Sequence, residues 1–308
     1  METKIYREFV SRFNSFDGKI FLIEKLTRDA GFFVYNGNLS FVVKNSQQNR
    51  NSINTKFVEF IPSLEIISVA NYPSFERGNY DFLVLKEKEN EEIIDSFINI
   101  CSLYINNPII SFNEFIQSIV DLFQLTRQQG YLDCIGLFGE LLFLKTMYEN
   151  GIDFSNYWHL SGIFSKYDIS LSELNLEVKT SVNESTTFRI KHSQLFNGDK
   201  NIVVLISIRN TELGGESLET ITRYFKNTKP FSDNLRFFIA LEKELQKKIE
   251  PDMFCKRFSL VNICFFDCNR ISTLKSIPYN ISDVVYDYTF DLNDSFDLND
   301  LKKMYLKK

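Results

Sequence analysis

The chain has 308 residues, of which 44% are hydrophobic and 24% charged, so it can build one large core or two smaller ones and does not have the composition of a disordered chain. Its formal net charge of −5 argues against indiscriminate coating of nucleic acid, although a locally basic cleft stays possible. The apolar runs are too short to span a membrane and no secretory leader is apparent. We therefore expect a cytoplasmic protein with no membrane partner.

The cysteines and histidines limit the chemistry further. Five cysteines with no CxxC spacing disfavour a disulfide framework or a zinc ribbon. The chain has only two histidines, His159 and His192, which argues against mechanisms that need several imidazoles, and neither is assigned a catalytic role. Metal chemistry is expected to depend on carboxylates.

Residues 1–110 are predicted to form a β-rich domain that recognises the target or a partner. Two β-type runs flank Asn36-Gly37, a dipeptide typical of a tight turn, so a hairpin is expected at 31–44. The polar stretch 45–56 is interpreted as a surface loop available for partner contacts. Further strands are expected at 57–60, 63–70 and 80–86, and helical spacing begins at Asn90.

Residues 111–308 are predicted to form a second, α/β domain. Helical patterns at about 113–123 and 131–149 precede strand-like runs at 166–171, 176–182, 187–190 and 201–208. Helices at 217–226 and 233–249 and a strand at 258–266 are then expected to complete an order of α-β-β-β-α-β. An acidic, aromatic tail follows at 281–300.

The most informative segment carries two acids and a lysine on predicted strands. Side chains alternate along a strand, so Glu177 and Lys179 share one face while Leu176 and Val178 pack on the other. A turn around 172–175 allows an antiparallel hairpin that sets Asp168 opposite Glu177. Such carboxylates can hold Mg²⁺, and a neighbouring lysine can orient or deprotonate water beside a phosphate. The alternative is an exposed, solvated strand face.

A second clue is Glu140, which lies among Gly136, Leu137, Phe143 and Leu144 on an apolar helix face. A carboxylate in such a place is costly unless it is paired. It is either salt-bridged in the core or, given the acids described above, an inward-pointing metal or lysine-orienting ligand.

The segments Gly136-Leu-Phe-Gly-Glu140-Leu, Leu176-Glu177-Val178-Lys179-Thr180 and Ser193-Gln194-Leu195, with an Asp in a β-run between the first two, resemble the PD-(D/E)XK nuclease superfamily. More narrowly, 130–210 is similar to PD-(D/E)XK-motif proteins that accompany bacterial restriction and phage-defence genes. The resemblance implies an αβββαβ core whose central mixed sheet is flanked by helices. It also implies Glu140, Asp168 and Glu177 as metal ligands and Lys179 as the catalytic lysine. Tyr167 replaces the proline of the motif, which supplies no ligand.

Weaker candidates surround this motif. Gln194 resembles a glutamine found after the strand in some of these nucleases, or it is a polar residue at a helix start. Arg189 and Lys191 could line a phosphate-facing cleft, or they are simply solvated. Trp158, His159 and Tyr157 could stack on a base, although a lone Trp often anchors a core.

Two functions are consistent with these features. The first is a DNA endonuclease that uses Mg²⁺, with Mn²⁺ able to substitute, acting in restriction or antiphage defence. The second is a catalytically silent nuclease-fold subunit that binds DNA or a larger defence complex. Cutting both strands requires two active sites, so a homodimer or a partner such as an ATPase or methyltransferase is expected.

Overall fold

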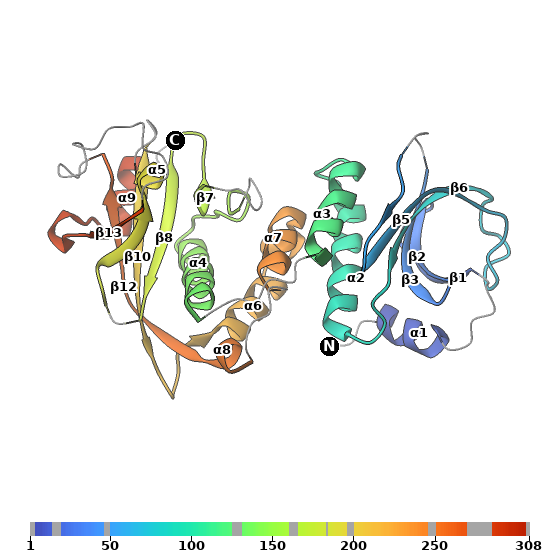
Figure 1. Ribbon diagram of the computed structural model, residues 1–308, viewed down its shortest axis with the longest axis horizontal. Helices are drawn as coiled ribbons and strands as arrows, with labels where there is room; N and C mark the ends of the chain where they lie inside the picture. Colours follow the sequence, from blue (N-terminus) through green and yellow to red (C-terminus); the bar gives the residue numbers. More distant parts are fainter. Residues whose placement is uncertain are drawn as a thin grey trace. The chain divides into compact units, whose positions relative to one another are not determined.

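The computed structural model describes residues 4–13, 20–45, 50–124, 131–159, 166–182, 184–195, 200–245, 251–269 and 285–305. The chain is a mixed α+β protein that divides into two compact units, Met1–Thr126 and Arg127–Lys308 (Figure 1). Within the described ranges, no helix is long and apolar enough to cross a bilayer.

The first unit is built on one antiparallel sheet with the strand order β1-β2-β3-β6-β5-β4. Its elements are α1 (Lys4–Phe13), β1 (Phe21–Lys25), β2 (Ala30–Tyr35), β3 (Asn38–Lys44), β4 (Ile53–Asn54), β5 (Val58–Ile66), β6 (Gly78–Leu85), α2 (Glu91–Asn106) and α3 (Phe112–Gln124). The predicted hairpin is confirmed: β2 and β3 pair on either side of Asn36 and Gly37, whose φ angles of 49° and 70° suit a tight turn.

Two expectations for this unit are wrong in detail. The runs at 57–60 and 63–70 belong to one strand, β5, whose pairing with β6 shifts register between Ile61 and Leu64. The stretch 45–56 is not only a surface loop, because β4 extends the sheet and the Arg50 guanidinium pairs with the buried carboxylate of Asp81. The polar composition of 45–56 revealed neither the pairing of β4 with β5 nor the pairing of Arg50 with Asp81.

The boundary between the units lies after Thr126 rather than after residue 110. Helix α3 packs on the first sheet, since the ring of Phe115 lies 6.1 Å from Phe41 and 4.1 Å from Tyr104 on α2. The expectation had assigned this helix to the second domain. Its amphipathic pattern predicted the helix correctly but could not say which core its apolar face would join.

The second unit carries a five-stranded mixed sheet of order β11-β12-β10-β8-β7 and a separate two-stranded sheet, β13-β9. Its elements are α4 (Tyr131–Glu149), β7 (Ile169–Ser170), β8 (Asn175–Ser181), β9 (Thr187–Lys191), α5 (His192–Leu195), β10 (Asn201–Asn210), β11 (Glu216–Ser217), α6 (Leu218–Asn227), η2 (Phe231–Asp233), α7 (Leu235–Leu245), α8 (Pro251–Cys255), β12 (Arg257–Asp267), β13 (Val285–Thr289), η4 (Leu292–Asp294) and α9 (Leu298–Tyr305).

The order α4-β7-β8-β9-α5-β10 agrees with the predicted αβββαβ core. The helix between the third and fourth strands is the short α5 rather than the pattern at 217–249, which forms α6 and α7 further along. The third strand also departs from a continuous sheet, because β9 pairs with β13 from the acidic tail while β8 pairs directly and in parallel with β10.

The two faces of the five-stranded sheet bury different cores. Leu176 and Val178 on β8 join the larger core together with residues of α4, which lies beside this strand (Figure 1). Val203 and Leu205 on β10 point the other way and pack with Phe290 beyond β13. Glu177 and Lys179 are paired in register with Val203 and Leu205, so they lie on this second face, as the alternation predicts.

Helix α4 approaches β8 very closely at one glycine. A Cβ added at Gly139 would lie 1.7 Å from Thr180 Oγ1, so only glycine fits this contact. An added Cβ at Gly136 would meet nothing within 4 Å, so the close contact does not require glycine at this position. The close approach at Gly139 fixes the position of the next residue, Glu140.

Candidate functional site

The short hairpin of β7 and β8 brings Asp168 next to Glu177. Ile169 pairs with Leu176, and continuing this antiparallel register by one residue sets Asp168 opposite Glu177. The turn is closed by a hydrogen bond from Leu171 N to Leu174 O of 2.8 Å. The backbone N–H of Val178 donates to Asp168 Oδ2 at 2.7 Å, which fixes the aspartate carboxylate against β8. The predicted pairing of these two acids is therefore present.

Glu177 is buried, with 5% of its side chain exposed, and is held by two donors. Lys179 Nζ and Gln194 Nε2 both donate to its Oε1, at 2.5 and 2.7 Å. Its other oxygen, Oε2, is buried without a hydrogen-bond partner among the described residues. Leaving a carboxylate oxygen unpaired away from water is costly, which indicates that a further group belongs there.

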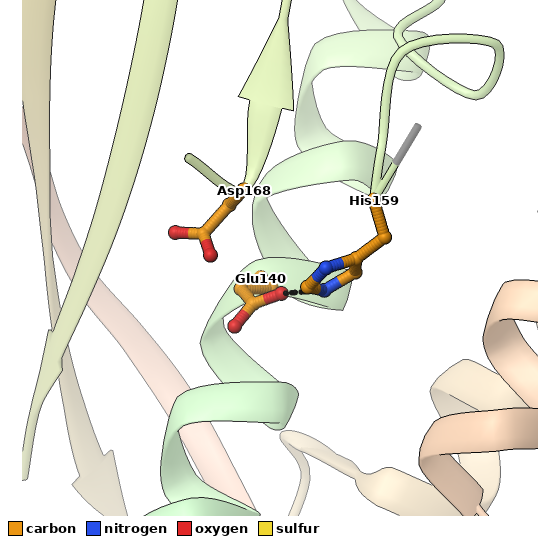
Figure 2. Close-up of side chains that lie close together, drawn as sticks. All are labelled: Glu140, His159 and Asp168. Atoms are coloured by element: carbon orange, nitrogen blue, oxygen red, sulfur yellow. Dashed lines mark hydrogen bonds and ion pairs between the residues drawn. The ribbon is translucent and has the colours of Figure 1, made fainter. Parts of the chain in front are cut away.

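Glu140 reaches the same place from α4. Its Oε2 accepts a hydrogen bond from Trp158 Nε1 at 3.0 Å and lies 3.0 Å from His159 Nε2. Trp158 is 3% exposed and packs on Phe237, so it is both a core anchor and a donor to Glu140. Figure 2 shows His159 and Asp168 gathered around the Glu140 carboxylate.

The sequence did not reveal His159 as a candidate metal ligand. Atoms of Glu140, His159 and Asp168 that could each bind a metal all lie within 4.8 Å of one another. The only sequence signal was proximity to Trp158 in a segment already considered for base stacking. A histidine that lies 9 residues before Asp168, with no recognisable spacing, becomes a neighbour of that carboxylate only in the folded chain.

The crowding of carboxylates changes their acidity. Burial, followed by the charges of Glu140 and Glu177, raises the pKa of Asp168 well above its usual range. Burial also raises the pKa of Glu177, although the nearby Lys179 partly opposes this. For Glu140, burial would raise the pKa, but the hydrogen bonds from His159 and Trp158 outweigh it and the net shift is downward.

Lys179 supplies positive charge to this cluster. Burial lowers the pKa of the ammonium, but the negative charges of Glu177, Asp168 and Glu140 outweigh burial and raise it overall. Its side chain is 22% exposed, compared with 5% for Glu177, so Lys179 is less deeply buried than the acid it contacts.

The weaker candidates are arranged differently. Gln194 touches the site through Glu177 and is locked by two further bonds, from Lys191 N to its Oε1 and from its Nε2 to Lys166 O. Arg189 and Lys191 are exposed on β9, and no hydrogen bond or ion pair within the described part of the chain joins their side chains to the carboxylates. Their substrate-binding role stays a prediction.

The donor set fits a divalent cation. Three carboxylates and an imidazole converge, Glu177 offers an unpartnered buried oxygen, and burial together with the charges of Glu140 and Glu177 raises the pKa of Asp168. Carboxylate oxygens of this kind are the usual ligands of Mg²⁺ and Mn²⁺.

Comparison with known families identifies one match. Residues 33–247 match the family model DUF4420, which is described as "Putative PD-(D/E)XK family member". The matched segment includes Glu140, Asp168, Glu177 and Lys179, and it begins within the first unit. No curated protein and no solved structure matches the chain significantly.

Proposed function

Since the match covers more than two thirds of its length, the chain belongs to the DUF4420 family of PD-(D/E)XK proteins, and we propose that it is a metal-dependent DNA endonuclease. Family membership gives a nuclease-type fold. The proposal adds the activity, the substrate and the metal, which is Mg²⁺ with Mn²⁺ able to substitute.

One observation carries this proposal: Asp168 and Glu177 converge on one edge of a sheet with Glu140 and with Lys179. The raised pKa of Asp168 reflects first its burial and then the neighbouring acids, an arrangement that destabilises the protein unless positive charge is added. Such a cluster is better suited to binding a cation than to holding the fold together.

In the proposed reaction, Glu140, Asp168 and Glu177 hold the divalent ion. When bound, that ion neutralises charge on the scissile phosphate and lowers the pKa of a water molecule. Lys179 places an ammonium 2.5 Å from Glu177 Oε1, where it adds positive charge beside the phosphate. Gln194 keeps Glu177 in position through its 2.7 Å hydrogen bond and so acts as a positioning residue.

The proposed biological role is restriction or antiphage defence. It is supported by the resemblance of the motif-bearing segment 130–210 to proteins that accompany such genes. The proposed role of the β-rich first unit, Met1–Thr126, is to recognise the target or a partner, and the second unit, Arg127–Lys308, carries the chemistry. The family match begins at residue 33, which is consistent with a first unit that belongs to the functional protein.

The experiment is a cleavage assay on supercoiled plasmid, modified and unmodified, with Mg²⁺ or Mn²⁺ and with EDTA as the metal-free control. Nicked or linear product that depends on metal and disappears in Lys179→Ala supports the proposal. Tight DNA binding without cleavage under every metal condition would instead identify a catalytically silent nuclease-fold subunit.

One proposed active site per chain predicts that double-strand cleavage requires a partner. One centre hydrolyses one strand, so double-strand cleavage requires a second copy of the chain or another protein. Light scattering with and without DNA should detect a homodimer on the substrate. A strict monomer that cuts both strands in one binding event would contradict this expectation.

A further inference from the structure

The backbone around His159 is built to hold the imidazole beside Asp168. Trp158 forms a β-bridge with Ile169, and His159 N donates to Asp168 O at 3.0 Å. His159 has a φ of 47°, in the left-handed region that is unfavourable for a residue with a Cβ. Backbone strain of this kind persists only where surrounding contacts impose it, and here those contacts are the bridge and the buried Trp158 ring.

The imidazole also has the right separation from its neighbours for a shared ion. Two ligands that bind next to one another at ~2.1 Å from an octahedral ion are ~3.0 Å apart, and opposite ligands are ~4.2 Å apart. His159 Nε2 lies 3.0 Å from Glu140 Oε2, and the set that includes Asp168 lies within 4.8 Å. The 4.8 Å limit is slightly wider than the ~4.2 Å span of opposite ligands, so binding one shared ion requires the three side chains, which face one another in Figure 2, to draw together by a few tenths of an ångström.

We propose that His159 is a direct ligand of the metal, together with Glu140 and Asp168, and that it makes the centre prefer Mn²⁺ over Mg²⁺. The inference rests on the metal-dependent centre proposed above. It changes the ligand set of that centre, because the sequence predicts a site made of carboxylates alone. An imidazole nitrogen binds transition metals well, whereas Mg²⁺ favours hard oxygen ligands and retains its waters.

Trp158 strengthens this assignment. Because its indole N–H already donates to Glu140 Oε2, that carboxylate does not need His159 as a donor in order to be satisfied. His159 is also 22% exposed, so its ring can be reached by an ion from solvent. Its place at the rim of the buried acids is therefore suited to completing a ligand set.

The test uses the full-length chain loaded with Mn²⁺ and pulsed electron paramagnetic resonance, which detects the nitrogen of a directly coordinated imidazole. The chain has two histidines, so His159→Asn and His192→Asn assign the signal. Asparagine is chosen at 159 because it tolerates a positive φ. We expect the wild type and His192→Asn to show the imidazole signal and His159→Asn to lose it.

Calorimetry supplies the second measurement. The wild type should bind Mn²⁺ at least about tenfold more tightly than Mg²⁺, and His159→Asn should weaken Mn²⁺ binding about tenfold while changing Mg²⁺ binding by less than about threefold. The spectra of the wild type and of His192→Asn decide the ligand even if His159→Asn does not fold.

The outcomes separate this inference from the proposed nuclease. Bound Mn²⁺ without an imidazole signal in the wild type overturns His159 as a ligand and leaves a carboxylate centre intact. A signal that is lost only in His192→Asn also overturns it. If neither metal binds at all, the proposed metal-dependent nuclease fails together with the inference.

Discussion

Both units of the protein bury a carboxylate beside a cation, but the two sites are completed in different ways. In the first unit, Asp81 is 1% exposed and both of its oxygens have partners, since Oδ2 pairs with Arg50 and Oδ1 accepts from Ser63 N at 2.9 Å. In the second unit, Glu177 is almost as buried, yet its Oε2 has no partner among the described residues and two further acids lie nearby.

The difference separates a structural ion pair from the proposed metal site. The Asp81 carboxylate is matched by one guanidinium, which also packs over the Phe112 ring at 4.7 Å, so the pair ties the 50–54 segment and the irregular part of β5 to the sheet. Around Asp168 the acids outnumber the nearby lysine, and the excess is what a bound cation would neutralise. Burial by itself therefore does not mark function, whereas an excess of buried acids over nearby cations is typical of a ligand site.

The largest effect is expected on DNA cleavage when Lys179, the cation beside Glu177, is removed. Lys179→Ala should reduce DNA cleavage by roughly 10³-fold, because the ammonium supports charge that develops in the transition state, while DNA affinity changes little. Single-turnover cleavage with matched protein concentrations measures this. Lys303→Ala, on the exposed end of α9, provides the control. Wild-type turnover by Lys179→Ala would remove the lysine from the mechanism.

Mutation of the Asp81–Arg50 pair should change the stability of the protein rather than its activity. Asp81→Asn leaves the buried Arg50 charge unpaired and should cost about 3 kcal/mol of unfolding free energy in urea denaturation. The exposed pair of Lys44 and Glu76 gives the control, because solvent screens it, and Glu76→Gln should leave the urea midpoint unchanged. An unchanged free energy of unfolding in Asp81→Asn would contradict the assignment of Asp81 and Arg50 as a structural ion pair.

In the metal-free protein, Asp168→Asn should raise the free energy of unfolding, whereas Asp81→Asn should lower it. The pKa of Asp168 is raised by folding, so its contribution to stability is present at low pH and is lost as pH rises through the folded pKa. The neutral amide, which can still accept from Val178 N, should therefore be more stable than the wild type at pH 7, and the difference should shrink on acidification. Thermal melts across pH measure this.

The same variant should lose the response to metal. Wild-type protein at a Mn²⁺ concentration of 100 times its dissociation constant should gain about 2.7 kcal/mol, whereas Asp168→Asn should gain much less. Equal gains for the two proteins would mean that Asp168 does not bind the ion.

A smaller loss of stability is expected when the close contact between Gly139 and Thr180, which positions Glu140, is disturbed. Gly139→Ala should cost about 2 kcal/mol, because the new methyl would collide with Thr180 unless α4 moves away from β8. Gly136→Ala faces open space and should be neutral or slightly stabilising. Chemical denaturation of the two variants compares them directly, and equal stabilities would contradict the close packing at Gly139.

The smallest effect concerns the donor to Glu140. Trp158→Phe keeps an aromatic ring against Phe237 but removes the indole N–H, and it should weaken Mn²⁺ binding by about tenfold. Tyr157→Phe, at the neighbouring exposed position, is the matched control. Calorimetry in which both variants bind like the wild type would show that Trp158 serves only the core.

Much of the fold follows from local patterns. The helix at 131–149, the hairpin around Asn36-Gly37 and the parallel strand at 201–208 were predicted close to their observed positions because periodicity and turn residues act over a few residues. The alternation along β8 also predicted correctly that Glu177 and Lys179 share a face. These features depend on short-range geometry, which the order of residues determines.

Other features depended on partners that are distant in the sequence. Helix α3 has a clear apolar face, but only packing on Phe41 assigns it to the first unit. Strand β9 has the pattern of a core strand, yet it pairs with β13, about 100 residues later, instead of with β8. Local propensity does not choose among partners, since many strands could satisfy the same hydrogen bonds.

The sequence by itself determined that Asp168 lies opposite Glu177 and that Glu177 shares a strand face with Lys179, because strand alternation and the spacing from Asp168 to Glu177 fix their relative directions. Only the tertiary structure decided that His159 joins them. Its imidazole reaches Glu140 because Trp158 is buried, the loop bridges to β7, and the backbone at 159 adopts a positive φ. Those three conditions arise from packing between segments, which leaves no periodic signal in the chain.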